Sequence, residues 1–299
     1  MIIVNIKDGL GNQMFQYATA HVLAKKMNTS VVCDIRYLIE KKLNPPKDYV
    51  VRNFDLDIFN INPSKINYFD LIQTFQFFKS YIVRHNLTKF LDKFNLHVLM
   101  ERSRKVDLRI INNKKKTLYI DGYWQSEEYF KDYRDEIIKL FNFDDLKNIE
   151  DKLIFLDKIN LENDVCLNVR RTDHLKSTEL NAVTLNYYKN SIDYFRKKFN
   201  SSIKFYVFSD DLDWCKKNFG ENYNFIYIDH DKAGKKFKNY LYLMSCFKNF
   251  IIPNSTFAWW AAWLSNMEKK IILAPKNWSG LITEKKIDTV PSSWIRINN

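Results

Sequence analysis

Short apolar runs alternate along this chain with segments whose apolar residues recur at helical spacing. The opening shows the pattern best. A β-branched run at 2–6 leads into a glycine turn at 8–11, followed by helical spacing over 13–25 and a second apolar run at 30–33. Strand, glycine turn, helix and strand in this order are typical of a parallel α/β layer. We therefore expect the chain to begin with a parallel sheet.

The second half of the chain repeats this alternation more regularly. We expect a second, doubly wound parallel sheet there, with ligand-binding groups on the loops that follow the strands. The predicted strands are 164–169, 203–208, 225–228, 249–252 and 270–273, and the predicted helices are 184–199, 212–219, 237–247 and 256–264.

The stretch between these two regular parts is less periodic. We interpret residues 40–116 as insertions and helices that cover the first sheet, with helical stretches at 69–84 and 87–100. The further elements predicted here are a strand at 117–121, a helix that reaches about residue 141 and a polar linker at 142–163. The pattern as a whole predicts an α/β protein of two Rossmann-like lobes, residues 1–150 and 151–299, that face each other across a cleft.

Composition narrows the class of protein. With 46% hydrophobic and 27% charged residues over 299 positions, the chain has enough apolar residues for packed cores, which excludes disordered and fibrous classes. The 47 Lys and Arg against 35 Asp and Glu give a net charge of +12, which favours a polyanion, a phosphorylated ligand or an anionic membrane surface as partner. Nucleic acid is disfavoured because the basic residues are spread along the whole chain and no helix-turn-helix, RRM signature or zinc finger is present.

The apolar runs and the cysteines favour a cytoplasmic location. The run at 1–7 is too short for a secretory signal, and the run at 250–264 is interrupted by Pro253 and polar residues, so neither is expected to cross a bilayer. The four cysteines form no CxxC pair and lie mostly in apolar context, which favours buried, reduced thiols over disulfides or a zinc site. These residues are Cys33, Cys166, Cys215 and Cys246.

Two segments combine strand ends with groups that bind anions. The glycine turn at 8–13 brings backbone N–H groups to the start of a helix, although a turn without a ligand explains the glycines equally well. Arg170 and Arg171 follow a buried strand, where paired guanidinium groups are costly without an anion. Our preferred interpretation pairs one of them with Asp173 and leaves the other for a ligand; the alternative is that both are structural.

Two further segments follow strands of the second half. Asp210 and Asp211 begin a predicted helix, so capping of its N–H groups is favoured over a metal-binding DxD motif, and no metal site is expected. The hydroxyl and amide groups at 254–256 form a second candidate anion site at a helix start. The tryptophans that follow at 259, 260 and 263 have helical spacing, which favours core packing over stacking on a sugar.

Six motifs follow one another along the chain: GLGNQMFQYA at 9–18, GYWQS at 122–126, VRRTD at 169–173, FSDD at 208–211, LMS at 243–245 and NSTFAWWAAWL at 254–264. Taken together and in this order, they resemble glycosyltransferase family 11, the α-1,2-fucosyltransferases. The resemblance implies a GT-B fold and a metal-independent, inverting transfer of L-fucose from GDP-fucose to the 2-hydroxyl of a galactoside. In bacterial members the acceptor is commonly a lipopolysaccharide O-antigen or capsule intermediate, and the two lobes serve the acceptor and the nucleotide sugar respectively.

The resemblance also implies roles for individual residues. Arg170 matches the arginine that binds the donor pyrophosphate, and Asn12 matches a neighbour of the phosphates. Asp8, just before the glycine turn, is a candidate general base, with a purely structural carboxylate as the alternative. The other predicted donor-binding residues are Asn168, Asp173, Ser209, Asp210, Tyr240, Asn254, Ser255, Thr256 and Phe257.

Two departures from the family pattern leave the nucleotide open. Asn168 replaces the usual histidine and Tyr240 the usual acidic residue, both at positions that help hold guanine in related enzymes, while Asn168 and Asn239 still offer amide groups. We expect GDP-fucose first; the alternatives are another nucleotide sugar or a non-catalytic nucleotide-sugar-binding protein. The remaining basic runs, such as 196–198, 235–238 and 114–116, predict peripheral contact with an anionic inner membrane. The pattern indicates no oligomeric state.

Overall fold

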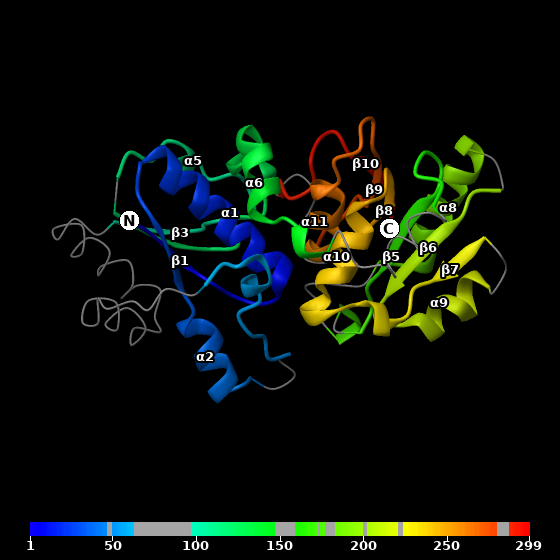
Figure 1. The fold of residues 1–299 in the computed structure, drawn as a ribbon, viewed down its shortest axis with the longest axis horizontal. Coiled ribbons are helices and arrows are strands. Elements are labelled where there is room, and N and C mark those ends of the chain that lie inside the picture. The colour runs from blue at the N-terminus through cyan, green and yellow to red at the C-terminus, as the bar shows by residue number, and fades with distance from the viewer. Residues whose placement is uncertain are drawn as a thin grey trace. The chain divides into compact units, whose positions relative to one another are not determined.

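The protein consists of two compact units, Met1–Leu140 and Phe141–Asn299, each built around its own parallel sheet (Figure 1). The predicted boundary at residues 150 and 151 lies outside the described residues. The structure is a computed structural model that describes residues 1–46, 50–62, 97–115, 117–146, 159–172, 174–176, 183–199, 202–220, 224–279 and 287–299.

Four parallel strands form the sheet of the first unit, in the order β2-β1-β4-β3. They are β1 (Ile2–Asn5), β2 (Val31–Asp34), β3 (His97–Met100) and β4 (Leu118–Asp121). The predicted opening is confirmed, because α1 (Leu10–Lys26) connects β1 to β2 and buries most of its apolar residues. The sheet changes direction of winding between β1 and β4, and this is the place where parallel α/β sheets hold ligands.

The described residues of the first unit also form shorter helices. These are α2 (Arg36–Leu43), α5 (Leu108–Ile111) and α6 (Arg134–Leu140), with 3-10 turns η1 (Leu56–Phe59), η2 (Glu127–Tyr129) and η3 (Lys131–Tyr133). The predicted helical stretch at 87–100 is wrong at its end, where β3 pairs with β4. The predicted helix that reaches about residue 141 is confirmed as α6, which ends at Leu140 and directly follows the 3-10 turn η3. The helical stretch predicted at 69–84 lies outside the described residues.

The second unit has a six-stranded parallel sheet in the order β7-β6-β5-β8-β9-β10. Helices α8 and α9 cover one face and α10 and α11 the other (Figure 1). The strands are β5 (Val165–Val169), β6 (Phe205–Ser209), β7 (Phe225–Tyr227), β8 (Asn249–Ile251), β9 (Ile271–Pro275) and β10 (Ile295–Ile297). The helices are α8 (Leu185–Phe199), α9 (Leu212–Phe219), α10 (Lys238–Ser245) and α11 (Thr256–Leu264).

This strand order is that of a Rossmann fold, numbered 3-2-1-4-5-6 from β5 onward, so the predicted pair of Rossmann-like α/β lobes is confirmed within each unit. Every strand and helix predicted for the second half is present, and β10 is the one strand among the described residues there that was not predicted. The predicted linker is wrong at its start, because residues 141–146 pack onto the second unit. Phe141 contacts Trp260 edge to face, and Asp145 pairs with Lys238.

The core of the second unit confirms the packing role predicted for the tryptophans. Trp259 and Trp260 are fully buried, and Trp259 donates its indole N–H to the Thr289 carbonyl at 2.8 Å. The four cysteines are free thiols, and three of them are buried, as predicted. Among the described residues, we find no helix whose length and hydrophobicity would let it cross a lipid bilayer.

Candidate active site

The strand order of the second unit brings two of the predicted segments to neighbouring strand ends. β5 and β8 are adjacent, and the chain reverses its direction of winding between them. Leu167 pairs with Ile251 in the last step of their ladder; Arg170 follows three residues after the first, and Asn254 three residues after the second. Doubly wound sheets bind ligands at this switch point, outside the carboxyl ends of the strands. Arg170 and the start of α11 therefore belong to the same edge of the sheet.

Asp210, at the end of β6, orients the arginine loop that follows β5. Its Oδ2 atom lies 3.3 Å from Arg170 Nη1 and accepts the Thr172 hydroxyl at 2.5 Å, while its Oδ1 atom accepts the Arg171 N–H at 2.9 Å. The predicted capping role is therefore wrong for this residue. Asp210 ties two strand-end loops together instead, and it holds the half-exposed Arg170 side chain in place.

Arg171 has a structural role. Its guanidinium lies 3.9 Å from the centre of the Trp214 ring, and its Nε atom lies 3.3 Å from Asp211 Oδ2. Asp211 also caps α9, as predicted, by accepting the Trp214 N–H at 3.1 Å. One arginine is thus structural and the other lies at the switch point. Asp173, the predicted partner, lies outside the described residues.

Two residues that were predicted to bind the sugar donor, Asn168 and Ser209, stabilise the strand ends around the arginine loop through hydrogen bonds. Asn168 is buried at the end of β5 and donates its amide to the Phe208 carbonyl at 3.0 Å. Ser209 is buried as well, and its hydroxyl accepts the Asp211 N–H at 2.9 Å. The Asn168 bond ties the end of β5 to β6, and the Ser209 bond stabilises the turn that follows β6. Both lie at the edge of the sheet where Arg170 follows β5.

The start of α11 supplies backbone donors at the same edge. The first bond within this helix runs from the Trp259 N–H to the Ser255 carbonyl, so the amides of Thr256, Phe257 and Ala258 precede it. Ser255 occupies the N-cap position and its side chain makes no capping bond. Amides at a helix start favour an anion. Asn254 and Ser255 are buried beside them.

Tyr240 belongs to a cluster of aromatic side chains that also includes Phe208 and Phe237. Its hydroxyl donates to the Ile228 carbonyl at 2.6 Å, its ring contacts Phe208, and burial raises its pKa. Phe237 contacts both Tyr240 and Phe257, is 54% exposed and has a backbone φ of 60°, an uncommon value for an aromatic residue. The accessible aromatic surface is therefore that of Phe237.

In the first unit, two glutamines of the GLGNQMFQYA segment build the glycine turn. Gln13 donates to the Asp8 and Asn53 carbonyls, each at 2.7 Å, and accepts the Asp55 N–H at 2.8 Å. Gln16 accepts the Lys7 N–H at 2.9 Å. Both are fully buried, so the motif amides hold the turn itself rather than a ligand.

Asp8 and Asn12 are bonded to the loop that follows β4. The Tyr123 hydroxyl donates to Asp8 Oδ2 at 2.6 Å, and the Gln125 amide donates to Asn12 Oδ1 at 2.7 Å. Asp8 has a φ of 58°, in the left-handed region that non-glycine residues rarely adopt. The switch point of the first sheet therefore carries a carboxylate with a defined partner.

Sequence reasoning missed Glu101, which shapes this loop. Its carboxylate accepts the Tyr123 N–H at 2.7 Å and the Trp124 N–H at 3.1 Å, and burial raises its pKa against the opposing effect of these bonds. Because the residues before it were interpreted as a helix, nothing placed Glu101 at a strand end. Its position after an apolar run of three residues, 98–100, was the available signal.

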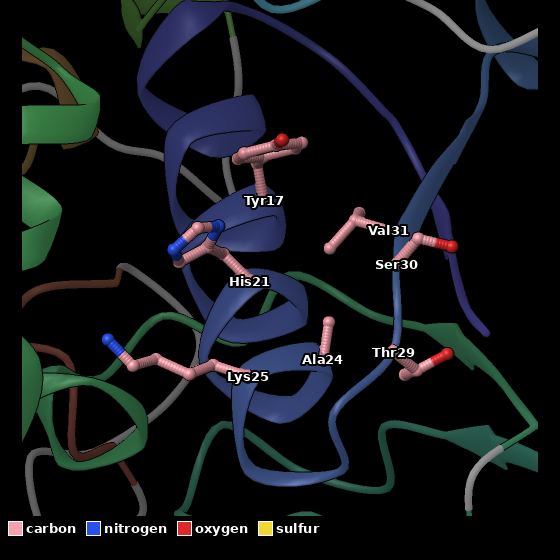
Figure 2. A pocket seen from close by; sticks show the side chains of 7 residues that line it. All are labelled: Tyr17, His21, Ala24, Lys25, Thr29, Ser30 and Val31. Atoms are coloured by element: carbon pink, nitrogen blue, oxygen red, sulfur yellow. The ribbon is translucent and has the colours of Figure 1, made fainter.

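A cavity of about 330 Å³ in the first unit lies away from these residues (Figure 2). Side chains of α1 and of the segment that leads into β2 line it, at the end of α1 opposite the glycine turn. None of the predicted site residues takes part. The lining residues are Tyr17, His21, Ala24, Lys25, Thr29, Ser30 and Val31. Within the described part of the chain, no cluster of three metal-ligating side chains is present.

Comparisons with known proteins agree with the sequence resemblance. The profile of Glycosyl transferase family 11 matches residues 1–298. An alpha-1,2-colitosyltransferase of Escherichia coli is 32% identical over 305 residues, covering 99% of both chains. The O-antigen biosynthesis glycosyltransferase WbnK of Escherichia coli is 28% identical over 307 residues, covering 98% of this chain and 99% of that protein.

Among solved structures, the fucosyltransferase NodZ from Bradyrhizobium aligns with a TM-score of 0.45 at 12% identity, covering 87% of this chain and 90% of that one. The family match, together with two parallel α/β units, confirms the predicted GT-B class.

Proposed function

Because the chain belongs to glycosyltransferase family 11, we propose that it transfers L-fucose from GDP-fucose to the 2-hydroxyl of a galactoside, with inversion and without a metal ion. The observation that carries this proposal is the switch point of the second sheet. There, Arg170 and the amides that begin α11 follow adjacent strands, β5 and β8. A diphosphate is the part of a nucleotide sugar that such a pair of groups recognises.

The proposed chemistry uses these groups on the leaving group. As the bond between the sugar C1 and the phosphate oxygen breaks, negative charge grows on the β-phosphate and C1 gains oxocarbenium character. The Arg170 guanidinium, oriented by Asp210, would stabilise that charge together with the Thr256 and Phe257 amides. Asn254 and Ser255 would line the same subsite. Asn12 is the donor-binding residue that the family resemblance assigns in the first unit. Asp8 would accept the proton of the acceptor hydroxyl.

The nucleotide and the sugar need separate tests. Asn168 and Tyr240 donate hydrogen bonds to the carbonyls of Phe208 and Ile228, so one donor of each side chain is already engaged within the protein. The relative named as a colitosyltransferase favours colitose as the second candidate sugar. Colitose is L-fucose without its 3-hydroxyl, so the two donors differ by one polar group.

A donor screen tests the proposal. Calorimetry of the purified protein with GDP, UDP and dTDP is expected to show tightest binding of GDP; tighter binding of UDP or dTDP would contradict the nucleotide assignment. Mass spectrometry of reactions with lactose and N-acetyllactosamine, each with GDP-fucose or GDP-colitose, then identifies the sugar. Faster transfer of colitose would replace fucose in the assignment, and nucleotide binding without any product would favour a non-catalytic binding protein.

We also propose that the acceptor is an O-antigen or capsule intermediate in the cytoplasm, reached by peripheral contact with an anionic membrane. Arg196, Lys197 and Lys198, in the last turn of α8, are the basic run that supports this contact. Lys238 does not, because it is buried and paired with Asp145. Sedimentation with anionic and neutral liposomes at low salt tests the contact; equal recovery in both pellets would rule it out.

A further inference from the structure

Asp8 and Tyr123 join the two central strands of the first sheet at their carboxyl ends. Asp8 follows β1 and Tyr123 follows β4, its neighbour in the sheet, and the Tyr123 hydroxyl donates to Asp8 Oδ2 at 2.6 Å. The pair therefore lies at the switch point of this sheet. Asp8 holds its left-handed φ of 58° without being glycine, and such strain persists where a side chain is needed.

Tyr123 is itself held by two further contacts, which involve Arg104 and Glu101. The Arg104 guanidinium lies 4.6 Å from the centre of its ring, and Arg104 also donates to Gln125 at 3.1 Å. The Tyr123 N–H donates to the Glu101 carboxylate, and the Gln125 amide in turn donates to Asn12 Oδ1. The hydroxyl of Tyr123 consequently has a defined position, and it restricts the Asp8 carboxylate to one orientation.

We propose that Tyr123 is a positioning residue that aims the Asp8 carboxylate at the acceptor hydroxyl; the proposal rests on the proposed transferase function. In the step, the acceptor oxygen forms its bond to C1 while the bond from C1 to the phosphate oxygen breaks and its electron pair leaves with the nucleoside diphosphate. The acceptor proton moves to the Asp8 carboxylate, which later releases it to water. Tyr123 keeps its own proton throughout.

The charges around the pair are consistent with these roles. Burial, followed by the neighbouring Asp8, raises the pKa of Tyr123 far above its usual range, so it donates and does not act as the base. Lys7 lies over the Tyr123 ring and pairs with Asp121. The other charged or titratable groups that face the pair are Arg104, Tyr37 and Glu101, and Arg52 lies beside Gly9.

Removing the hydroxyl by Tyr123→Phe is expected to lower kcat about 10- to 100-fold, as for loss of a hydrogen bond to a charged group, with little change in the KM of the donor. A donated hydrogen bond stabilises the ionised carboxylate, and Tyr123→Phe removes that bond. The acid limb of the kcat/KM profile is therefore expected to move to higher pH.

A matched control comes from β4, the strand that precedes Tyr123. Tyr119, in β4, donates its hydroxyl to Asp34 at 2.9 Å, so Tyr119→Phe removes the same kind of bond. We expect this variant to melt at lower temperature and to keep the wild-type pH profile. An unchanged pH profile in Tyr123→Phe would overturn the proposal.

A double-mutant cycle separates positioning from structure. If Tyr123 acts through Asp8, then Tyr123→Phe has no further effect on kcat in an Asp8→Asn protein, whereas independent roles would multiply the two losses. Multiplied losses would overturn the proposal. Wild-type protein that transfers no sugar from any donor would instead refute the proposed function, so the two failures are distinguishable.

Discussion

The Arg170 guanidinium lies 3.3 Å from the Asp210 carboxylate, across two adjacent strand ends of the second sheet. Asp210 reaches the next two residues as well, through the backbone N–H groups of Arg171 and Thr172. The arginine loop is thus held by a carboxylate from the neighbouring strand before any ligand is present. Such prior orientation is what allows a fixed cation to stabilise charge that grows on a leaving group.

Replacing each arginine of the pair separates chemistry from stability. Arg170→Ala is expected to lower kcat about 100- to 1000-fold, as for loss of one preorganised donor, with a melting temperature close to that of the wild type. Arg171→Ala is expected to lower the free energy of unfolding by about 1 kcal/mol, because it removes the cation–π contact between the guanidinium and the Trp214 ring. Enzyme kinetics and thermal melts of both variants check this. Retained turnover in Arg170→Ala would contradict the assigned role.

The two neighbouring aspartates offer a second comparison. Asp210→Asn puts an amide where the carboxylate accepts several donors, so we expect Arg170 to move, the KM of the donor to rise and kcat to fall about 10-fold or more. Asp211→Asn is expected to have small effects, since asparagine caps a helix as well as aspartate does. Steady-state kinetics with varied donor measures both. Equal losses in the two variants would refute the specific role of Asp210.

The fold was predictable where the local structure depends on residues that are close together in the sequence. The strands of the second sheet are continuous apolar runs because both of their faces are covered, and α11 begins and ends where its sequence pattern indicates. β3 was mistaken for the end of a helix because its four residues, His97–Met100, are too few to show a period of two. β10 was missed because Arg296 interrupts its apolar residues, whereas β7 and β8, which also have three residues, lie in longer apolar runs.

The site was predictable in its residues more than in its contacts. Motifs indicated Arg170 and Asp210 separately, but their contact joins residues 40 positions apart and depends on β5 and β6 being neighbours. The bond from Tyr123 to Asp8 spans 115 positions in the same way. Local sequence patterns do not predict such contacts, because the contacts depend on which strands are neighbours in the sheet.

Two motif glycines are expected to respond differently to alanine. A Cβ atom on Gly122 would lie 2.4 Å from Glu101 Cβ and 2.8 Å from the buried Trp124 ring, so Gly122→Ala is expected to lower the free energy of unfolding by about 1–3 kcal/mol. The nearest atom to a Cβ atom on Gly9 would be Arg52 Nε, at 3.7 Å, which is ordinary contact. Gly9→Ala is therefore expected to keep wild-type stability. Urea unfolding of the two variants tests this, and similar stability losses would contradict it.

Cys33 and Tyr17 are expected to make the first unit sensitive to alkali. Burial raises the pKa of Cys33 from 9.0 to about 12 and that of Tyr17 from 10.0 to about 12. Because both groups hold their protons more tightly in the folded chain, their contribution to stability is complete below pH 9. It is lost as pH rises from 9 toward 12, by up to about 1.4 kcal/mol per pH unit for each group.

Urea unfolding between pH 8 and 11 measures this dependence. The Cys33→Ala and Tyr17→Phe variants each lack one titrating group, so their free energies of unfolding are expected to fall less steeply with pH than that of the wild type, whatever their stability at pH 8. The double variant is expected to show the shallowest slope. Parallel slopes in all four proteins would show that neither group titrates differently in the folded and unfolded chains, and would place the alkaline sensitivity elsewhere.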